Sequence, residues 1–430
     1  MGAGTAQGGA CLLISGKVRK NMEFVVFAGV LLLLFIFMIV QELIQTKNQE
    51  KLFKKYLREN YGKEPPKEYS LERFARLGSY LERHKEEKQL DDITWNDLGM
   101  DEVFRRIDRT YSAAGEEYLY YTLRNISCGR EALEHLEEVV NWLQEQENIK
   151  VRIQLLMKRL GHLGKYSLYD YLDNLDYLGE RSNRKIVLGN LLYLPFLLLL
   201  FVQPAMGTIG IVLCMLWHIM TYFREKKVIE PYIISFAYVL RLIDVCEELE
   251  KQKIPVYRRE LDELREALKS LRELRRGAYW VMAGNQGKIG GNPLDILADY
   301  LRMILHLDIF QFNRMLEKLR KKTGQVETML AITGYLDMAI SVGGFRKSLE
   351  GYCIPKLEED TEKAFLHMKK GWHPLLSQPV KNSIRADRGI LLTGSNASGK
   401  STFLKMVAVN AVLAQTIHTC AAESYHAPIF

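Results

Sequence analysis

Hydrophobic residues form two long runs without charged side chains. The first run covers residues 24–40, and the second covers residues 186–222. The second run contains no acidic or basic residue except His218, and Gln203-Pro204 and Gly207 interrupt its apolar pattern. A helix needs about 20 apolar residues to cross the hydrocarbon core of a bilayer. The pattern therefore predicts three transmembrane helices: a single helix at 24–40, and a helical hairpin at 186–222 whose turn lies at Gln203–Gly207.

The residues around these runs indicate how each would sit in a membrane. A cleaved signal peptide is the alternative for 24–40, but no small-residue cleavage site follows it, so an uncleaved anchor is favoured. A buried pair of core helices is the alternative for 186–222. Basic residues flank the hairpin and are absent from its turn, which places the flanks in the cytoplasm. We expect a multi-pass protein of the cell membrane, with the tail 1–23 outside and the bulk of the chain cytoplasmic.

Helical patterns dominate the rest of the chain. Residues 41–91 indicate a charged linker, and apolar residues then recur at spacings of three and four, as on one face of an amphipathic helix. We expect two helical regions, 92–185 and 223–362, the second including a coiled-coil-like seam. The net charge is only +7, and the basic residues between 258 and 276 alternate with acidic ones, which indicates a solvated helix face rather than a nucleic-acid stripe. The apolar positions are Leu133, Leu136, Val140 and Leu143, then Leu261, Leu264, Leu268 and Leu271.

The pattern changes near residue 363. Ala364–Met368 and Gly389–Thr393 are short apolar runs typical of strands, the second of a buried strand. A helix is expected at Ser401–Gln415. A strand, a loop and a helix in this order are the context in which a P-loop occurs. Residues 363–430 are therefore expected to form part of an α/β nucleotide-binding domain.

The loop between the second strand and the helix fits G-x-x-x-x-G-K-[ST] in full. Its backbone amides and the positive end of the helix would hold the phosphates of ATP. Lys400 would neutralise β- and γ-phosphate oxygens, and Ser401 would ligate the Mg²⁺ that accompanies the nucleotide. The predicted nucleotide-binding residues are Gly394, Ser395, Asn396, Ala397, Ser398, Gly399, Lys400, Ser401 and Thr402.

Hydrolysis requires more than the phosphate loop. An acidic residue on a second strand normally holds the metal-bound water, yet Glu423 is the one carboxylate after Gln415. We therefore expect only the N-terminal half of the ATPase domain here, and we assign no catalytic residue. His373 precedes a proline, which favours a structural or base-edge role. The scattered cysteines favour neither a zinc site nor a disulfide framework.

Several motifs resemble those of the MutS family of mismatch-repair ATPases. Thr393–Thr402 is similar to its T-G-P-N-M-[SG]-G-K-S-T loop, and Leu413-Ala414-Gln415 to the end of the following helix. Gly371–Leu375 resembles the R-H-P segment. Tyr335–Ser341 resembles the L-D-x-L-x-S helix, and Thr110–Leu119 the T-x-x-G-x-R-x-L element of the family core.

This resemblance implies an ATP-dependent protein that binds mismatched DNA, dimerises through its ATPase domain and moves long helical levers. The chain also departs from the family pattern. The Phe-x-Glu wedge of the mismatch-reading domain has no counterpart, and the base-stacking aromatic would fall near Pro379. We expect a mainly α protein with a C-terminal partial α/β P-loop ATPase domain. The alternative is a non-catalytic membrane scaffold with a vestigial P-loop; a transporter ATPase is disfavoured because no paired charges mark an intramembrane pathway.

Overall fold

The computed structural model describes residues 37–38, 40–41, 44–64, 69, 71–86, 88–126, 129–163, 167–275, 300–359, 364–395 and 399–429. The chain divides into two compact units, Met1–Asn60 and Tyr61–Phe430. In the first unit, residues 44–60 are helical. The predicted membrane span at 24–40 lies outside the described residues except for positions 37, 38 and 40.

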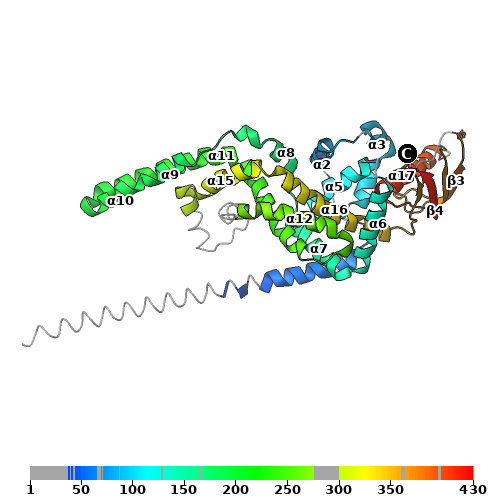
Figure 1. Ribbon diagram of the computed structural model, residues 1–430, viewed down its shortest axis with the longest axis horizontal. Helices are drawn as coiled ribbons and strands as arrows, with labels where there is room; N and C mark the ends of the chain where they lie inside the picture. The colour runs from blue at the N-terminus through cyan, green and yellow to red at the C-terminus, as the bar shows by residue number, and fades with distance from the viewer. Residues whose placement is uncertain are drawn as a thin grey trace, which may run out of the picture. The chain divides into compact units, whose positions relative to one another are not determined.

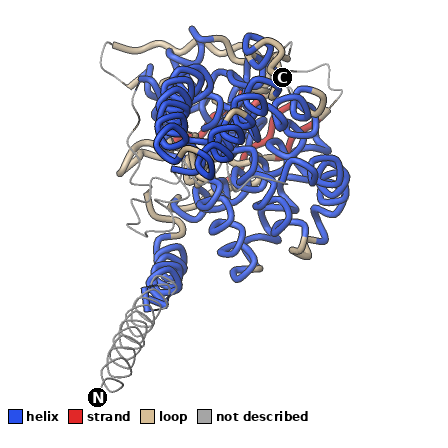
Figure 2. The backbone as a smooth tube through the Cα atoms, turned by 90° about the vertical axis from the view of Figure 1, so that its left-hand side faces the viewer, coloured by secondary structure: helices blue, strands red, loops and turns tan. Residues whose placement is uncertain are grey.

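The second unit is mainly helical, as the sequence predicts, and its strands are confined to one small sheet (Figures 1 and 2). Short 3-10 segments occupy Leu175–Leu178, Pro255–Tyr257 and Arg272–Arg275. The α-helices are α2 (Leu71–Arg83), α3 (Asp92–Leu98), α4 (Met100–Ile107), α5 (Ala113–Arg124), α6 (Arg130–Glu145), α7 (Glu147–Leu160), α8 (Leu168–Asp173), α9 (Arg184–Leu191), α10 (Tyr193–Val202), α11 (Pro204–Glu250), α12 (Arg258–Leu271), α15 (Leu307–Arg320), α16 (Thr323–Ser348) and α17 (Lys400–Ile417).

The amphipathic stripes predicted from the sequence are buried. Those on α6 and α12 belong to the core, with Leu264, Leu268 and Leu271 fully enclosed. The seam on α12 packs against α11 and α16 of the same chain. The spacing of its leucines therefore serves the interior of this helical body, where burial of each leucine contributes about 1.5–3 kcal/mol.

Helix α16 lies at the centre of the helical body, in contact with α4, α5, α6, α7, α11 and α12. It is long and apolar enough to cross a membrane, but 83% of its most apolar window is buried inside the protein. A helix that is hydrophobic around its whole circumference is expected in a core or in a membrane. Its contacts identify α16 as a core helix.

Asp337 of α16 joins this helix to the start of α5. Its carboxylate accepts hydrogen bonds from the backbone amides of Tyr111 and Ser112 at 3.0 and 2.9 Å and from the Ser112 hydroxyl at 2.6 Å. Ser112 in turn caps α5 by accepting from the Gly115 amide. One turn further along α16, the Ser341 hydroxyl donates to the Ile107 carbonyl. The two motifs at 110–119 and 335–341 therefore meet in space.

The glycines at this junction allow the two helices to approach closely. A Cβ atom on Gly115 would lie 2.4 Å from Oδ2 of Asp337, and one on Gly334 would lie 2.6 Å from the Ala114 carbonyl oxygen. Both distances are below the contact distance of real side chains. Small residues at these positions are required by the packing of α5 on α16.

The apolar hairpin predicted at 186–222 consists of α9, α10 and the first part of α11. Arg184–Val202 and Pro204–Glu230 are each long and apolar enough to cross a membrane, and little of the first is buried. The turn is tighter than predicted: Gln203 alone separates α10 from α11. Pro204 fits the first turn of a helix, because the amide that proline lacks has no partner there.

The hairpin helices pack closely and then lead into the core. A Cβ atom on Gly207 or Gly210 would collide with Leu200 or Phe196 of α10. Helix α11 continues without a break for 47 residues, and its second half buries residues such as Phe236 and Ile243. The hairpin and the helical body therefore share one continuous helix (Figure 1).

The sheet has the strand order β1-β4-β2-β3. β1 (Lys356–Glu358) pairs in parallel with β4 (Ser424–Pro428), and β2 (Leu366–Gly371) is antiparallel to both β4 and β3 (Asn382–Ala386). The strand predicted at 364–368 is confirmed for Leu366–Met368, which belong to β2, whereas Ala364 and Phe365 precede it. The coil between β3 and α17 leads to the phosphate loop.

The buried strand predicted at Gly389–Thr393 is wrong. These residues form no strand, and Ile390 and Leu391 are 55% and 88% exposed. A strand that precedes a P-loop is buried only when parallel neighbours lie beside it. No strand in the described part of the chain pairs with this segment, so its apolar side chains face solvent.

Replacing Gly115 with alanine tests the α5–α16 junction. We expect Gly115→Ala to lower the free energy of unfolding by about 1–3 kcal/mol, because the new methyl group forces Asp337 away from the α5 amides. Gly324→Ala, in the first turn of the same α16, is the control: its Cβ meets no atom within 4 Å, so we expect stability to be unchanged or raised by up to ~1 kcal/mol. Thermal unfolding of the detergent-solubilised chain measures both. Equal effects of the two substitutions would contradict the close contact.

Candidate nucleotide site

The N-terminus of α17 forms the centre of the candidate site. Helix α17 begins at Lys400, and the preceding Gly399 adopts a left-handed conformation with φ 86°, which favours glycine. Gly399, at the N-cap position, has no side chain with which to cap the helix. Its first amides and its dipole therefore offer the partial positive charge that holds phosphates at helix N-termini. Asn396, Ala397 and Ser398 lie outside the described residues.

A cavity of about 800 Å³ opens at this helix end, within the size range of pockets that hold small-molecule cofactors. The structure brings most of the described motif residues into its lining, while Ser401 and its hydroxyl are exposed in the first turn of α17 outside the lining. Motif residues in the lining are Gly394, Ser395, Gly399, Lys400 and Thr402.

Lys400 spans the loop. Its ammonium group donates a hydrogen bond to the backbone carbonyl of Gly394, the first residue of the motif. The two ends of the loop therefore face one another across the cavity. An ammonium group in this place supplies the point charge that triphosphate oxygens require.

The segment after β2 forms another wall of the cavity. His373, Gln378 and Val380 line it together with Leu376 and Asn382. Burial, and then the nearby positive charge of Lys405, lower the pKa of His373, which favours the neutral ring. The aliphatic Leu376 and Val380 flank the predicted stacking position near Pro379, and Phe403 of α17 adds an aromatic ring to the lining.

Asn410 holds α17 against this wall, a role that no local sequence pattern indicates. Its side-chain amide donates to the Trp372 carbonyl at 3.0 Å, and its amide oxygen accepts from the Ala421 backbone at 2.7 Å. The side chain is fully buried. The helix that carries Lys400 is thus fixed to the segment that carries His373.

The far end of α17 is held by Arg346 of α16. The buried guanidinium group donates to the Ile417 and His418 carbonyls at 3.3 and 3.0 Å and to the Thr419 hydroxyl at 2.8 Å. It also forms a two-point ion pair with Glu137 of α6, at 2.7 and 3.1 Å. A guanidinium fork suits this bidentate geometry. We call this set the Arg346 clamp.

The electrostatics of the clamp favour an ionised Glu137. Burial acts to raise the pKa of its carboxyl, but hydrogen bonds from His418 and Arg346, together with the charge of Arg346, outweigh burial and lower the pKa to about 2. The ion pair is therefore fully formed at neutral pH. The helix that begins in the candidate site is tied by its other end to the central helix of the body.

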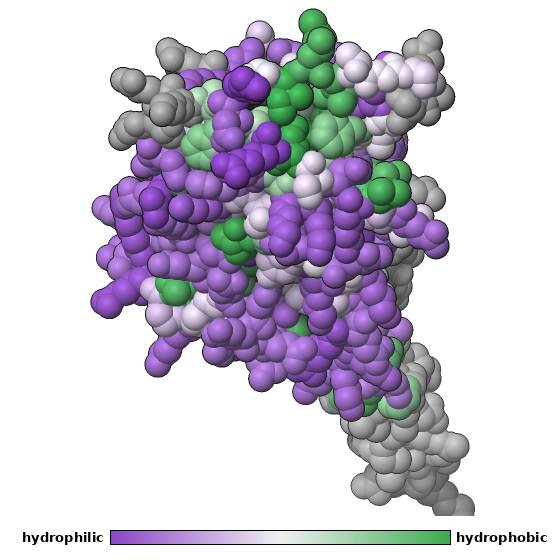
Figure 3. All heavy atoms as spheres, turned by 90° about the vertical axis from the view of Figure 1, so that its right-hand side faces the viewer, coloured by the Kyte–Doolittle hydropathy of each residue, from purple (hydrophilic) through white to green (hydrophobic). Residues whose placement is uncertain are grey.

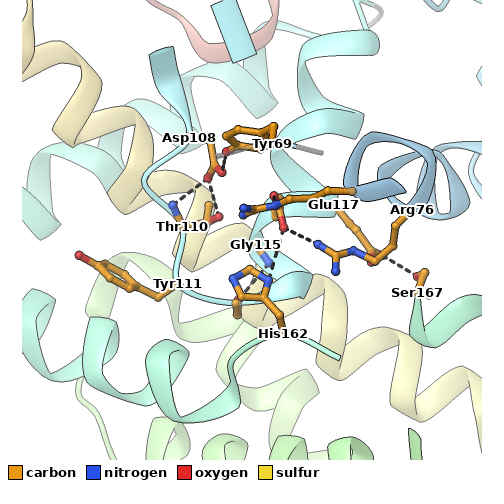
Figure 4. A network of polar contacts seen from close by, with 12 residues as sticks. Tyr69, Arg76, Asp108, Thr110, Tyr111, Gly115, Glu117, His162 and Ser167 are labelled. Atoms are coloured by element: carbon orange, nitrogen blue, oxygen red, sulfur yellow. Dashed lines mark hydrogen bonds and ion pairs between the residues drawn. The ribbon is translucent and has the colours of Figure 1, made fainter. Parts of the chain in front are cut away.

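A second polar network lies at α5 (Figure 4). Glu116 is fully buried and pairs with Arg73 and Arg76 of α2 at 2.5 and 2.9 Å. The adjacent Glu117 accepts a hydrogen bond from the Ser167 hydroxyl at 2.9 Å. Burial raises the pKa of Glu117 to about 8. One of these two neighbouring carboxyl groups is charged and paired, while the other is largely protonated at neutral pH.

Within the described residues, no group of three or more His, Cys, Asp or Glu side chains is arranged to hold a metal ion. Ser401, the second residue of α17, remains the predicted Mg²⁺ ligand. Its exposure in the first turn of α17 fits a ligand that meets the metal together with phosphate oxygens.

Comparison with known proteins points to one family. The chain is 32% identical over 124 residues to the DNA mismatch repair protein MutS of Acholeplasma laidlawii, a segment that is 28% of this chain and 14% of that protein. It is 30% identical over 138 residues to MutS of Leptospira interrogans and 28% identical over 123 residues to the human MutS protein homolog 4. This part of the chain is MutS-like. No protein-family model matches the chain.

The MutS-like part accounts for 27–30% of this chain, and the matches span only 12–16% of the relatives' own length. The sequence motifs that resemble the family lie on α5, α16 and α17 and in the wall of the candidate site, and they are spread over more of the chain than any one of these matches covers. The face of the molecule seen from the right of Figure 1 is largely hydrophilic, with its largest apolar area near the top of the view and smaller ones scattered over the rest (Figure 3).

Removing Arg346 tests the clamp. We expect Arg346→Ala to lower the free energy of unfolding by about 3–5 kcal/mol, because Glu137 and the carbonyls at the end of α17 lose their buried partner. The exposed Arg259, which pairs with Glu263 on α12, is the control; Arg259→Ala should change stability by less than about 1 kcal/mol. Chemical unfolding in detergent compares them, and a similar small loss for both would count against the clamp.

The raised pKa of Glu117 predicts a pH dependence. A carboxyl group whose pKa is raised on folding stabilises the folded state fully below the unfolded value of 4.5, and this contribution is lost as pH rises toward about 8. We expect the unfolding free energy to fall across this window by up to about 1.4 kcal/mol per pH unit. Glu117→Gln should flatten this dependence of the unfolding free energy on pH. Thermal unfolding at pH values from about 5 to about 8.5 measures it. An unchanged slope in this variant would refute the assignment.

Proposed function

We propose that this protein is a membrane-anchored, MutS-like ATP-binding protein in which the nucleotide state of the loop at 394–402 acts on the helical body. ATP with Mg²⁺ would occupy the cavity at α17, with Lys400 on the phosphates and Ser401 on the metal. One observation supports the proposal most directly: α17 begins at the phosphate loop, and its other end is held by the Arg346 clamp on α16.

The route from nucleotide to membrane follows packed helices. A displacement of α17 would pass through Arg346 to α16, which packs against α11, and α11 runs on into the apolar hairpin. Helices transmit such displacements because their packed side chains do not deform continuously. In this proposal the hairpin crosses the cell membrane as part of a multi-pass anchor, with the bulk of the chain on the cytoplasmic side.

We base the proposed partners of this protein on the segment that is similar to MutS proteins. The relatives bear the names of DNA mismatch repair proteins, and on that ground we include DNA binding and assembly into a homodimer through the ATPase domain in the proposal. The net charge of +7 is compatible with DNA but is modest for 430 residues.

A membrane scaffold with a vestigial loop is the second candidate. The exposed, unpaired segment at 389–393 favours it, because a working P-loop follows a buried strand. The two candidates differ in whether ATP binds at Lys400.

Nucleotide binding to the full chain in membranes separates them. We expect Lys400→Ala to weaken binding of a fluorescent ATP analogue with Mg²⁺ by roughly 10-fold or more, since a charge-assisted contact to phosphate contributes about 1.5–3 kcal/mol. Lys321→Ala is the control, an exposed lysine outside the cavity lining that pairs with Glu317 at 3.8 Å. Binding that is absent from the unmodified protein, or equal in Lys400→Ala, would reject the ATP-binding proposal in favour of the scaffold.

A further inference from the structure

A second cavity lies where the hairpin meets the helical body. It has a volume of about 390 Å³ and is bounded by α9, α11 and α15 together with the segment before α9. Side-chain amides fix the surrounding elements: Asn183 donates to the Phe310 carbonyl at 3.0 Å, and Asn190 to the Leu305 carbonyl at 3.1 Å. The cavity is therefore a built feature of the fold. The nucleotide site makes no use of it.

The cavity walls present cationic and polar groups. Lys185 and Arg181 line it, and no ion pair engages Lys185 within the described residues. Arg181 donates through Nη2 to Glu225 at 2.8 Å, while its Nη1 atom is buried without a hydrogen-bond partner in the described chain. A buried, unsatisfied guanidinium nitrogen beside an unpaired ammonium group is a receptor for an anion.

Two buried histidines form the floor of the cavity. His306 is 5% exposed and His218 is 1% exposed, and their rings lie 5.3 Å apart. His306 contacts the Thr221 hydroxyl through Nε2 at 3.3 Å, while its Nδ1 atom makes no well-aligned hydrogen bond in the described chain. Burial, and then the neighbouring His218, lower the pKa of His306 to about 4. The neutral ring adds a polar contact without adding charge.

The same cavity carries acidic groups. Glu180 and Glu225 line it alongside the two cations. Two acidic side chains beside two cationic ones disfavour a polyanionic ligand and suit one that carries a single phosphate and an amine. This is the charge pattern of a zwitterionic amine headgroup.

An apolar groove begins where this cavity ends. It has a volume of about 380 Å³, lies between α10 and α11, and is lined by residues such as Phe196, Ile209 and Leu213. Trp217 lines both spaces. Tryptophan is enriched at membrane interfaces, where one end of its ring is apolar and the other polar. A polar cavity and an apolar groove joined at a tryptophan match the two parts of a phospholipid.

We propose that an aminophospholipid binds at this junction, with its phosphate on Lys185 and Arg181, its amine beside Glu180 and Glu225, and an acyl chain in the α10–α11 groove. The proposal rests on membrane insertion of the hairpin, which belongs to the proposed function. Basic pockets at the cytoplasmic ends of transmembrane helices are known sites for lipid headgroups. The bound lipid would fix the angle at which α11 leaves the bilayer.

The test uses the full chain purified in detergent and native mass spectrometry with added lipid. We expect phosphatidylethanolamine to be retained in preference to phosphatidylcholine, whose quaternary amine cannot donate to the carboxylates. Lys185→Ala should reduce retention of phosphatidylethanolamine by roughly 10-fold. The control is Lys227→Ala, an exposed basic residue on α11 outside the cavity lining. Equal retention by Lys185→Ala and the unmodified chain would overturn the proposal.

Further measurements distinguish a lipid site from a site for free phosphoesters and from membrane anchoring alone. Glycerophosphoethanolamine, which has the headgroup without acyl chains, should fail to displace the lipid at matched concentration; efficient displacement would show a site for free phosphoesters and overturn the lipid assignment. Trp217→Leu should weaken retention of the lipid. Flotation with phosphatidylcholine vesicles separates this proposal from the proposed anchoring: a chain that does not float contradicts the anchor, whereas Lys185→Ala should float like the unmodified chain.

Discussion

The helical body depends on the buried carboxylate of Asp337. It accepts hydrogen bonds from the amides of Tyr111 and Ser112, the two residues that precede α5. A buried carboxylate is tolerated only where hydrogen bonds replace its hydration, and here the Ser112 hydroxyl adds a third donor. Because α16 also packs against α6, α11 and α12, this contact sets the position of α5 within the whole body.

Helix α17 extends this framework to the candidate site. Asn410 fixes its side to the wall that carries His373, and the Arg346 clamp fixes its end to α16 and α6. Neither residue lines the cavity itself. They act by holding the helix N-terminus in place, which matters because a dipole and a set of amides stabilise a phosphate only when they are already oriented toward it.

Both proposed sites, the nucleotide site and the lipid cavity, act on the long helix α11. Its first part, with α10, is exposed and apolar, and its second part is buried in the body. The cavity with Lys185 and His306 lies at the transition between these parts. A ligand bound there would therefore influence the direction of the same helix that α16 contacts from the nucleotide side.

Patterns with short spacing could be read from the sequence alone. The uncharged run at 186–222, the leucine stripes of α6 and α12 and the helix after the glycine-lysine loop depend on neighbours a few residues apart. The described structure has helices in all these places, and the leucines of α6 and α12 are buried. Only the tertiary structure decided the rest. Asp337 and Ser112 are 225 residues apart, and Arg346 and His418 are 72 apart, so no local pattern links them. The apolar run at 389–393 shows the same limit: its residues have strand character, but a strand is formed by hydrogen bonds to a neighbour, and no described strand lies beside it.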